Sequence, residues 1–318
     1  MYAQVTLSQL GKGCNRLMMR LILWLIFGFL PAVVLAQRYE LPDNGSKLIG
    51  QVQVHQVKQG EYFDLIAKQY NVGMLALMAA NPNIDPFLPA VGQLLTIPSH
   101  MLLPDAPRRG IVVNLPELRL YYYPKDSNEV HVFPVGIGRI GRETPQMNSK
   151  VKVKIPNPSW TPSPKLRQEY LAKYAKPLPA IVPAGPDNPL GKYAMQLAHG
   201  RGNYLIHGTN QNFGIGMRVS SGCIRLYPQD IKWLFDNTSI GESVVVINQT
   251  VKISSEPNGD KLIEVHSPLS KQNGQLPKKK TLPPKLTNLI RLEGVDRTMV
   301  GQALVSQSGM PVNFGITQ

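Results

Sequence analysis

Residues 204–226 read YLIHGTNQNFGIGMRVSSGCIRL, and this stretch decides how the rest of the chain is interpreted. A short apolar strand is predicted to deliver His207 into a Gly-Thr-Asn turn, and Cys223 follows sixteen residues later. The four glycines between these two side chains let the backbone turn tightly and approach a ligand closely. The order of strand, glycine-rich segment and cysteine predicts that a thiol and an imidazole meet at one site.

The residue types in this stretch suit nucleophilic catalysis. A cysteine forms a thiolate at neutral pH only beside a base or a positive charge. His207 can take that proton, and the amides of Gly222 and Cys223 can converge on an oxyanion. The alternative is a buried, unreactive cysteine, which is the commonest role of a single one. The combination of base, nucleophile and turn favours an enzyme.

The stretch resembles the signature of the L,D-transpeptidase catalytic domain, also called the YkuD domain. That signature begins with a His-Gly-Thr-Asn-like segment and ends with Ser-X-Gly-Cys, an apolar residue and Arg or Asn, as found here from His207 to Arg225. The resemblance implies that Cys223 is the nucleophile and that His207 is the general base. It also implies that the carbonyl of Gly208 orients the base.

The sequence departs from this family at two positions. Ser221 stands where many members have histidine, and Met147 replaces the usual glycine two residues after Pro145. Neither change affects the predicted catalytic pair.

Three residues are candidate substrate contacts. Arg225 could bind a substrate carboxylate or brace the catalytic loop, and Ser221 lies beside the predicted nucleophile turn. Trp160 could stack on a sugar or a stem peptide, or pack within a lid. No metal and no cofactor is predicted, because the six histidines show no ligand spacing.

Residues 52–98 show a β-α-α-β pattern. Apolar residues recur at helical spacing over 62–70 and 74–78, and a second strand is predicted at 94–97. The segments HQVKQGEYFDLIAKQYNV, LALMAANPNI and PAVGQLLTIP resemble the LysM domain. This resemblance implies binding to the N-acetylglucosamine-containing glycan of peptidoglycan. The alternative is a structural module without glycan affinity.

Residues 109–248 form the predicted catalytic domain, in which short strands alternate with turns. Residues 136–141 are expected to form a flexible loop, and residues 156–189, with nine prolines, a lid or substrate-binding insertion. The expected fold class is α+β: a mainly-β, β-sandwich-like YkuD-type catalytic domain with a small βααβ LysM domain. The predicted strands lie at 111–113, 118–123, 130–135, 193–197, 204–207 and 244–247, and the predicted helices at 165–174 and 229–237.

The remaining segments have simpler interpretations. Residues 37–51 are rich in turn formers and are expected to be a linker. Residues 249–318 are expected to hold a hairpin over 251–266, a basic proline-rich linker over 271–285 and a terminal helix over 295–305.

The N-terminus carries an apolar run, LILWLIFGFLPAVVLA, at Leu21 to Ala36. Three basic residues and no acidic residue precede it, which is typical of a secretory signal cleaved after Ala36. An uncleaved anchor is the alternative, although Pro31 and the short apolar length argue against it. Residues 1–36 are therefore predicted to be a signal peptide that meets the membrane only during export.

Composition restricts the partners of the exported chain. The 318 residues carry a formal net charge of +14, and removal of residues 1–36 leaves +11. A basic exported protein suits a carboxylate-rich cell wall, and export excludes nucleic acid. The only other cysteine, Cys14, lies ahead of the apolar run, so the mature chain has one thiol and no internal disulfide.

The order of domains resembles the ErfK/YbiS group of Gram-negative periplasmic enzymes, as do the segments WTPSPKLRQEY, LPAIVPAGPDNPLG and SGMPV. This resemblance implies a periplasmic location and a cysteine acyl-enzyme formed at the diaminopimelate of a peptidoglycan stem peptide. The acceptor would be the C-terminal Lys of an outer-membrane lipoprotein, or a second stem peptide that gives a 3-3 cross-link.

Two other functions stay open. The chain could be a thiol hydrolase of the same fold, acting as an L,D-carboxypeptidase or in lipoprotein release, because transfer and hydrolysis share the acyl-enzyme. It could also be a catalytically silent wall-binding protein, although the presence of both His207 and Cys223 argues against this.

Overall fold

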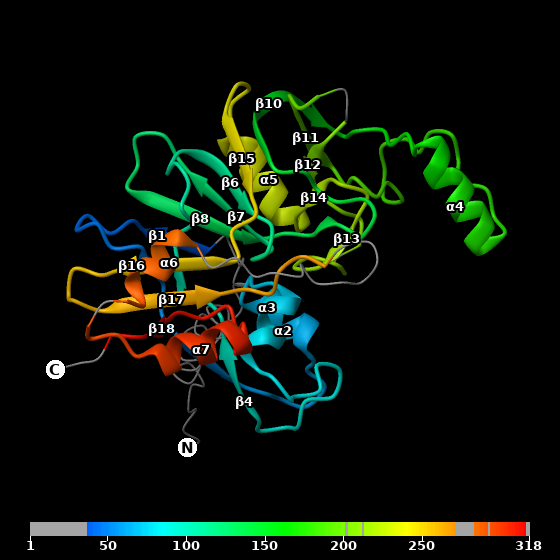
Figure 1. Cartoon of the computed structure of the whole chain (residues 1–318). Helices are drawn as coiled ribbons and strands as arrows, with labels where there is room; N and C mark the ends of the chain where they lie inside the picture. Colours follow the sequence, from blue (N-terminus) through cyan, green and yellow to red (C-terminus); the bar gives the residue numbers. More distant parts are fainter. Residues whose placement is uncertain (1–36, 201–202, 212, 271–282, 292, 316–318) are drawn as a thin grey trace, which may run out of the picture. The chain divides into compact units, whose positions relative to one another are not determined.

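The computed structural model describes residues 37–200, 203–211, 213–270, 283–291 and 293–315, all within the unit formed by residues 35–318 (Figure 1). The predicted signal peptide and most of the predicted basic linker lie outside the described residues. No helix in the described ranges is both long and apolar enough to cross a lipid bilayer.

The LysM-like module has the predicted β-α-α-β order. Strands β3 (Gln53–Gln56) and β4 (Leu94–Ile97) pair in antiparallel fashion. Helices α2 (Phe63–Gln69) and α3 (Met74–Ala80) lie between them in the chain. The apolar faces of both helices pack with the inward side chains of β4 into one core.

The Asn-Pro-Asn turn of this module begins with a buried asparagine. The side-chain nitrogen of Asn81 donates to the carbonyls of Leu77 and Thr96, at 2.8 Å each, and its oxygen accepts from the amide of Thr96 at 2.7 Å. These bonds satisfy a carbonyl at the end of α3 and join that helix to β4, so Asn81 has a structural role that the sequence pattern did not reveal.

A nine-stranded sheet forms the larger part of the structure. Its order is β1-β8-β7-β6-β15-β10-β11-β12-β14, in which β6 and β15 pair in parallel, as do β12 and β14. The six strands predicted for residues 109–248 are confirmed to within about one residue at each end. The strands are β1 (Gln37–Glu40), β6 (Gly110–Asn114), β7 (Arg119–Tyr123), β8 (Glu129–Pro134), β10 (Met147–Pro156), β11 (Tyr193–Leu197), β12 (Leu205–His207), β14 (Ile224–Arg225) and β15 (Ser243–Ile247).

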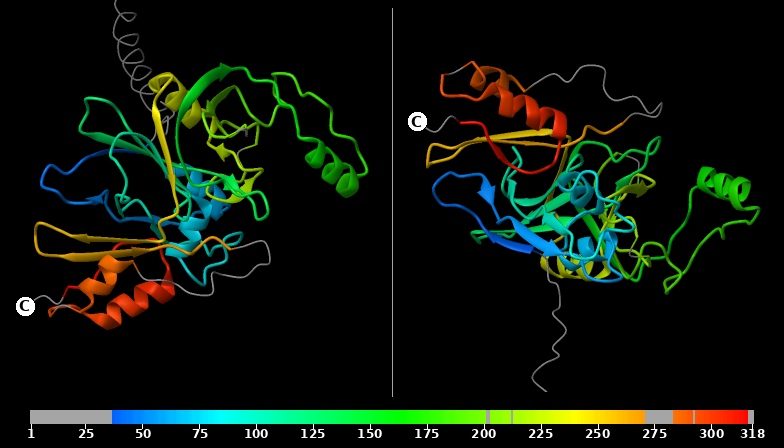
Figure 2. Two further views of the ribbon diagram at one scale, coloured as in Figure 1. Left: turned by 45° about the horizontal axis from the view of Figure 1, so that its top comes forward. Right: turned by 90° about the horizontal axis from the view of Figure 1, so that it is seen from below.

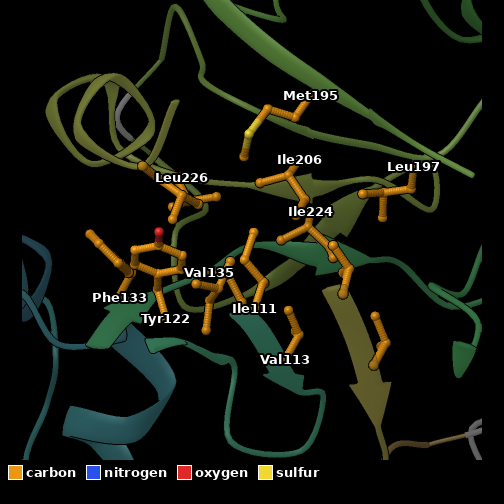
Figure 3. Close-up of a cluster of buried hydrophobic side chains, with 14 of the residues drawn as sticks. Ile111, Val113, Tyr122, Phe133, Val135, Met195, Leu197, Ile206, Ile224 and Leu226 are labelled. Atoms are coloured by element: carbon orange, nitrogen blue, oxygen red, sulfur yellow. The ribbon is translucent and has the colours of Figure 1, made fainter. Parts of the chain in front are cut away.

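The sheet curls, so strands that are far apart in its order face the same core (Figure 3). Ile111 of β6 and Phe133 of β8 share one cluster with Ile206 of β12 and Ile224 of β14, and each of these side chains is almost completely buried. Helix α5 (Pro228–Asn237), which was predicted at 229–237, adds apolar side chains to the same cluster. The expected α+β fold with a sandwich-like, mainly-β catalytic domain is confirmed.

The prediction of a linker at 37–51 was wrong. Strand β1 pairs in antiparallel fashion with β8 at the edge of the large sheet, and β2 (Leu48–Ile49) pairs with β5 (Met101–Leu102). The turn formers at 42–45 do form a turn, but they separate two short strands. The partners of both strands lie far away in the chain, and local sequence patterns carry no signal for such pairing.

Two further strands lie where a flexible loop or no element was expected. Strand β9 (Ile137–Gly138) falls within the expected loop at 136–141 and pairs in parallel with β13 (Arg218–Ser220). Strand β10 spans ten residues and pairs with both β11 and β15. The pairing of β9 with β13 matters for the site, because β13 leads into the nucleophile turn.

The insertion at 156–189 carries the predicted helix as α4 (Pro164–Tyr174). The hydroxyl oxygen of Ser163 accepts from the amide of Leu166 at 3.2 Å, and Pro164 occupies the first turn, where it displaces no hydrogen bond. Figures 1 and 2 show α4 at the end of an excursion from the large sheet, and none of its residues is buried.

The C-terminal region forms a small sheet covered by helices. Strands β16 (Val251–Ser255), β17 (Lys261–Val265) and β18 (Val312–Asn313) pair in this order, which confirms the predicted hairpin. Helix α7 (Arg297–Ser306) confirms the predicted terminal helix, and α6 (Pro284–Leu289) begins inside the range predicted as linker. The sheet and both helices share a core of their own.

Candidate active site

Two neighbouring strands bring the segments of His207 and Cys223 together. Strand β12 ends at His207, β14 begins directly after Cys223, and the two pair with Ile206 opposite Ile224 and His207 opposite Arg225. Ile206 and Ile224 point into the core. Because side chains alternate along a strand, His207 and Arg225 are directed to the opposite face. Cys223 directly precedes β14, so the predicted nucleophile lies at the start of the strand that pairs with the strand of the predicted base.

The imidazole of His207 is buried, with 3% of the residue exposed. Its Nδ1 lies 2.6 Å from the carbonyl oxygen of Gly208. A carbonyl oxygen only accepts, so this contact requires Nδ1 to carry the hydrogen and leaves Nε2 as the proton acceptor of the neutral ring. Burial, together with the charge of Arg225, lowers the pKa of His207 to about 4, although hydrogen bonds to the carbonyls of Gly208 and Leu190 oppose that shift. The ring is therefore neutral at physiological pH.

The thiol of Cys223 is half-buried, and its Sγ lies 3.7 Å from the carbonyl oxygen of Asn203. Burial raises the pKa of Cys223, while a hydrogen bond from the backbone of Leu205 and the charge of Arg225 oppose the rise. At neutral pH the imidazole is thus neutral and the thiol of the neighbouring segment is protonated. The arrangement suits a base that removes the thiol proton during attack, rather than a preformed thiolate–imidazolium pair.

The turn before Cys223 is fixed by its own hydrogen bonds. The hydroxyl of Ser220 donates to the carbonyl of Cys223 at 2.5 Å and accepts from the amide of Gly222 at 3.2 Å. Gly222 has a φ of +106°, which side-chain-bearing residues rarely adopt. Its predicted role as an oxyanion donor stays a prediction, and in this structure its amide already donates to Ser220.

Sequence reasoning missed one residue of this turn. The buried hydroxyl of Thr144 donates to the carbonyl of Gly222 at 3.0 Å and accepts from the amide of Gly138 at 2.9 Å. Thr144 therefore joins the nucleophile turn to the segment after β9. The Thr-Pro pair at 144–145 was the available signal.

A pocket of about 650 Å³ adjoins this face. Arg225 and Trp160 both line it, together with Leu166 and Tyr170 of α4. The Nε of Arg225 is buried and has no hydrogen-bond partner among the described residues. Two of the three predicted substrate contacts thus share one pocket, whereas Ser221 is exposed and does not line it.

Helix α4 is tied to the segment after β9 by charge. Arg139 and Arg142 each lie 2.8 Å from a carboxylate oxygen of Glu169 on α4. Leu166 and Tyr170 are four residues apart, so they share one side of α4, and both line the pocket. The insertion therefore forms one wall of the pocket.

The chain matches three family models. Residues 108–247 match the L,D-transpeptidase catalytic domain, residues 250–314 the L,D-transpeptidase C-terminal domain, and residues 55–98 the LysM domain. The resemblances to the catalytic and LysM domains are confirmed. The C-terminal match was not predicted, because only a hairpin, a linker and a helix were inferred there.

Three relatives from Escherichia coli strain K12 match almost the whole chain. The probable L,D-transpeptidase YcfS is 48% identical over 303 residues, which cover 91% of this chain and 94% of that protein. The probable L,D-transpeptidase ErfK/SrfK is 50% identical over 290 residues, covering 88% and 91%. The probable L,D-transpeptidase YbiS is 46% identical over 289 residues, covering 88% and 92%.

Proposed function

The chain belongs to the L,D-transpeptidase family, and on this premise we propose that it is a periplasmic, cysteine-dependent transpeptidase of peptidoglycan. The observation that carries the proposal is the pairing of β12 with β14, which sets Cys223 beside the strand that ends in His207. The LysM match supports a wall polymer as the substrate. The apolar run at Leu21 to Ala36, behind a basic flank, supports export.

The first half of the reaction forms an acyl-enzyme. Sγ of Cys223 attacks the carbonyl carbon of diaminopimelate that is bonded to the fourth-position D-Ala, while Nε2 of His207 takes the thiol proton. A C–S bond forms and the C–N bond to D-Ala breaks. The imidazolium then gives its proton to the leaving amine, so free D-Ala departs and a thioester remains.

The second half transfers the acyl group to an amine. The acceptor nitrogen attacks the thioester carbon, His207 takes a proton from that nitrogen, and the C–S bond breaks to leave a thiolate, which is reprotonated by the imidazolium. The acceptor is the C-terminal Lys of an outer-membrane lipoprotein, or a diaminopimelate side chain that gives a 3-3 cross-link. Water in place of the amine gives hydrolysis.

The neighbouring groups receive supporting roles. The amides of Gly222 and Cys223 stabilise the oxyanion, and the first exchanges its Ser220 partner for the substrate oxygen. Arg225, whose Nε has no partner among the described residues, binds a carboxylate of the stem peptide in the pocket that it shares with Trp160.

Product analysis tests this function. The purified protein is incubated with a tetrapeptide-stem muropeptide, with and without a peptide that ends in the lipoprotein Lys, and the products are identified by mass spectrometry. We expect release of D-Ala and a conjugate with one of the two amines, and neither product from Cys223→Ser. Release of D-Ala without a conjugate would indicate a hydrolase. Peptidoglycan binding without either product would indicate a silent wall-binding protein.

A further inference from the structure

The segment between the predicted base and nucleophile is in contact with both accessory regions of the chain. Residues 214–218, called the docked segment below, lie between His207 and Cys223 in sequence. On one side they meet the LysM domain, and on the other they meet residues that follow β17. If the LysM domain were joined to the enzyme only by a flexible tether, neither contact would be expected.

The contact with the LysM domain is a close approach of two backbones. The amide of Leu75, in α3, donates to the carbonyl of Gly216 at 3.3 Å. A Cβ added to Gly216 would lie 2.3 Å from the Cα of Gly73, and a Cβ added to Gly73 would lie 3.1 Å from the Cα of Gly216. Position 216 therefore requires glycine for the approach that is observed, whereas a Cβ at Gly73 would push its neighbour away by a few tenths of an ångström.

Side chains extend this interface on both sides of the glycines. Met217 of the docked segment packs against the LysM core. Asn71, which follows α2, and Asp230, in the first turn of α5, are both buried. Burial raises the pKa of Asp230 to about 7, although the nearby amide of Asn71 lowers it, and neither side chain has a direct hydrogen-bond partner among the described residues. The LysM domain thus contacts both the docked segment and the helix that follows the nucleophile strand.

The C-terminal region holds the other side of the docked segment. Nη1 of Arg218 donates to the carbonyl of Ser270 at 3.0 Å and lies 3.1 Å from its hydroxyl. The docked segment is therefore fixed between two domains that contribute no predicted catalytic residue.

Hydrogen bonds continue from the docked segment to the site. The amide of Gly216 donates to the carbonyl of Val135 at 3.2 Å, and the amide of Ile137 donates to the carbonyl of Met217 at 2.9 Å. Between them, Gly136 exchanges two backbone hydrogen bonds of 2.8 Å with Arg225. Arg225 is two residues from Cys223 and is paired with His207.

We propose that the LysM domain is a positioning element of the active site. Its contact with the docked segment, through Gly73 and Gly216, holds Arg225 and the nucleophile turn in their reactive arrangement. The reactivity of Cys223 therefore depends on a domain whose family is otherwise associated with binding. This proposal rests on the proposed function of Cys223. It adds that the reactivity of Cys223 depends on the LysM domain, which would not be so if that domain were only tethered.

Gly73 is the position for the test, because it has an ordinary φ of −74° and precedes α3 as its N-cap. Gly73→Ser adds a Cβ at the interface and keeps a residue that caps helices well. Gly73→Ala adds the same Cβ with the smallest possible side chain, and serves if the serine variant folds poorly. Gly301→Ala is the matched control, since it lies within α7 and a Cβ there meets nothing within 4 Å.

Three measurements are made on each full-length variant: the rate constant for acylation by a carbapenem, the pH profile of Cys223 alkylation by iodoacetamide, and sedimentation with purified peptidoglycan. For both Gly73 variants we expect acylation to be up to about 10-fold slower, because a 1 Å misplacement of reacting groups costs about 10²-fold and the added Cβ displaces its neighbour by a few tenths of an ångström. We also expect an altered alkylation profile and unchanged sedimentation, while Gly301→Ala behaves as the unmodified protein.

Two outcomes overturn the proposal. Acylation and alkylation of the Gly73 variants at the unmodified rates would show that the LysM domain only tethers the enzyme. A lower thermal stability with unchanged rate constants per folded molecule would show a purely structural contact. Absence of acylation in the unmodified protein would instead contradict the proposed function itself, so the two failures are distinguishable.

Discussion

Two buried histidines, His207 and His266, differ in what surrounds them. His207 meets a neutral carbonyl through Nδ1, and the nearby charge of Arg225 has the same sign as a protonated ring. His266 places Nε2 at 2.6 Å from a carboxylate oxygen of Glu264. The ring of His207 is neutral and its Nε2 can accept a proton, whereas Nε2 of His266 is already occupied by the carboxylate of Glu264.

The surroundings of His266 form a closed cluster of charges, defined here as Glu117, Arg119, Lys252, Glu264 and His266. The ammonium of Lys252 lies 2.9 Å from a carboxylate oxygen of Glu117 and 2.8 Å from one of Glu264. Burial opposes ionisation of Glu117, but the charges of Lys252, His266 and Arg119 hold its pKa below the usual value. The spacing of the two carboxylates and the imidazole would suit a cation, and Lys252 supplies that positive charge.

The charge cluster joins domains, because its members come from the β6–β7 hairpin, β16 and β17. Glu264 also accepts from the amide of Leu102 at 2.6 Å, which ties β17 to β5. The comparison predicts that changes at His207 alter chemistry and leave the fold, and that changes in the charge cluster alter the fold and leave the chemistry.

The largest expected effect is that of His207→Gln. Removal of a general base lowers rates by about 10²- to 10⁴-fold, so carbapenem acylation should slow by that factor. Because the ring is already neutral at pH 7, thermal unfolding at that pH should change little. Stopped-flow absorbance gives the rate and circular dichroism the unfolding curve. An unchanged acylation rate would remove His207 from the mechanism.

Lys252→Met should lower the free energy of unfolding and leave acylation unchanged. Removal of one partner of a buried ion cluster leaves uncompensated charge and costs about 3–5 kcal/mol in the free energy of unfolding. Acylation per folded molecule should stay the same. Urea denaturation measures the loss, and Lys232→Met, which breaks an exposed pair with Asp236, is the control with little effect. A full loss of acylation in folded Lys252→Met would contradict the prediction that the charge cluster affects stability and not chemistry.

The low pKa of His207 also predicts how stability depends on pH. The unfolded chain binds a proton at this ring below about pH 6.5, and the native chain only below about 4. Native stability should therefore fall as the pH drops through this window, by about 2–3 kcal/mol at pH 4.5 relative to pH 7. His207→Gln should lose less over the same range. Equal losses in both proteins would show that this histidine is protonated in the native state.

The smallest expected effect is that of Arg225→Gln. The positive charge of Arg225 favours the thiolate of Cys223, so its removal should move the alkylation profile of Cys223 to higher pH, by less than about one unit. Arg139→Gln, in the exposed pair with Glu169, is the matched control and should leave the profile in place. A shift to lower pH would contradict the placement of Arg225 beside the thiol.

The sequence predicted the parts of this picture that depend on local patterns. The His-Gly-Thr-Asn and Ser-Ser-Gly-Cys segments, the helical spacing of the LysM module and the helix at 165–174 each lie within a short stretch. The edge strand β1, the hydrogen bonds of Thr144 to Gly138 and Gly222, and the charge cluster could not be predicted in this way. Each joins residues that lie far apart in the chain, and the pairing of Glu117 with Lys252 leaves no trace in the residues around either.

The contact between Gly73 and Gly216 belongs to the same class. A glycine before a helix and a glycine in a loop are common features, and neither indicates in the sequence that the two lie in contact. Long-range contacts also explain the wrong prediction of a linker at 37–51, because the turn formers at 42–45 gave no indication of the strand pairs on either side.

The most direct measurement is the intact mass of the protein after incubation with a carbapenem. The account predicts one covalent adduct on the unmodified chain, located at Cys223 by peptide mapping, and no adduct on Cys223→Ser. An unmodified mass after prolonged incubation, or an adduct that persists on the serine variant, would contradict the assignment of Cys223 as the nucleophile.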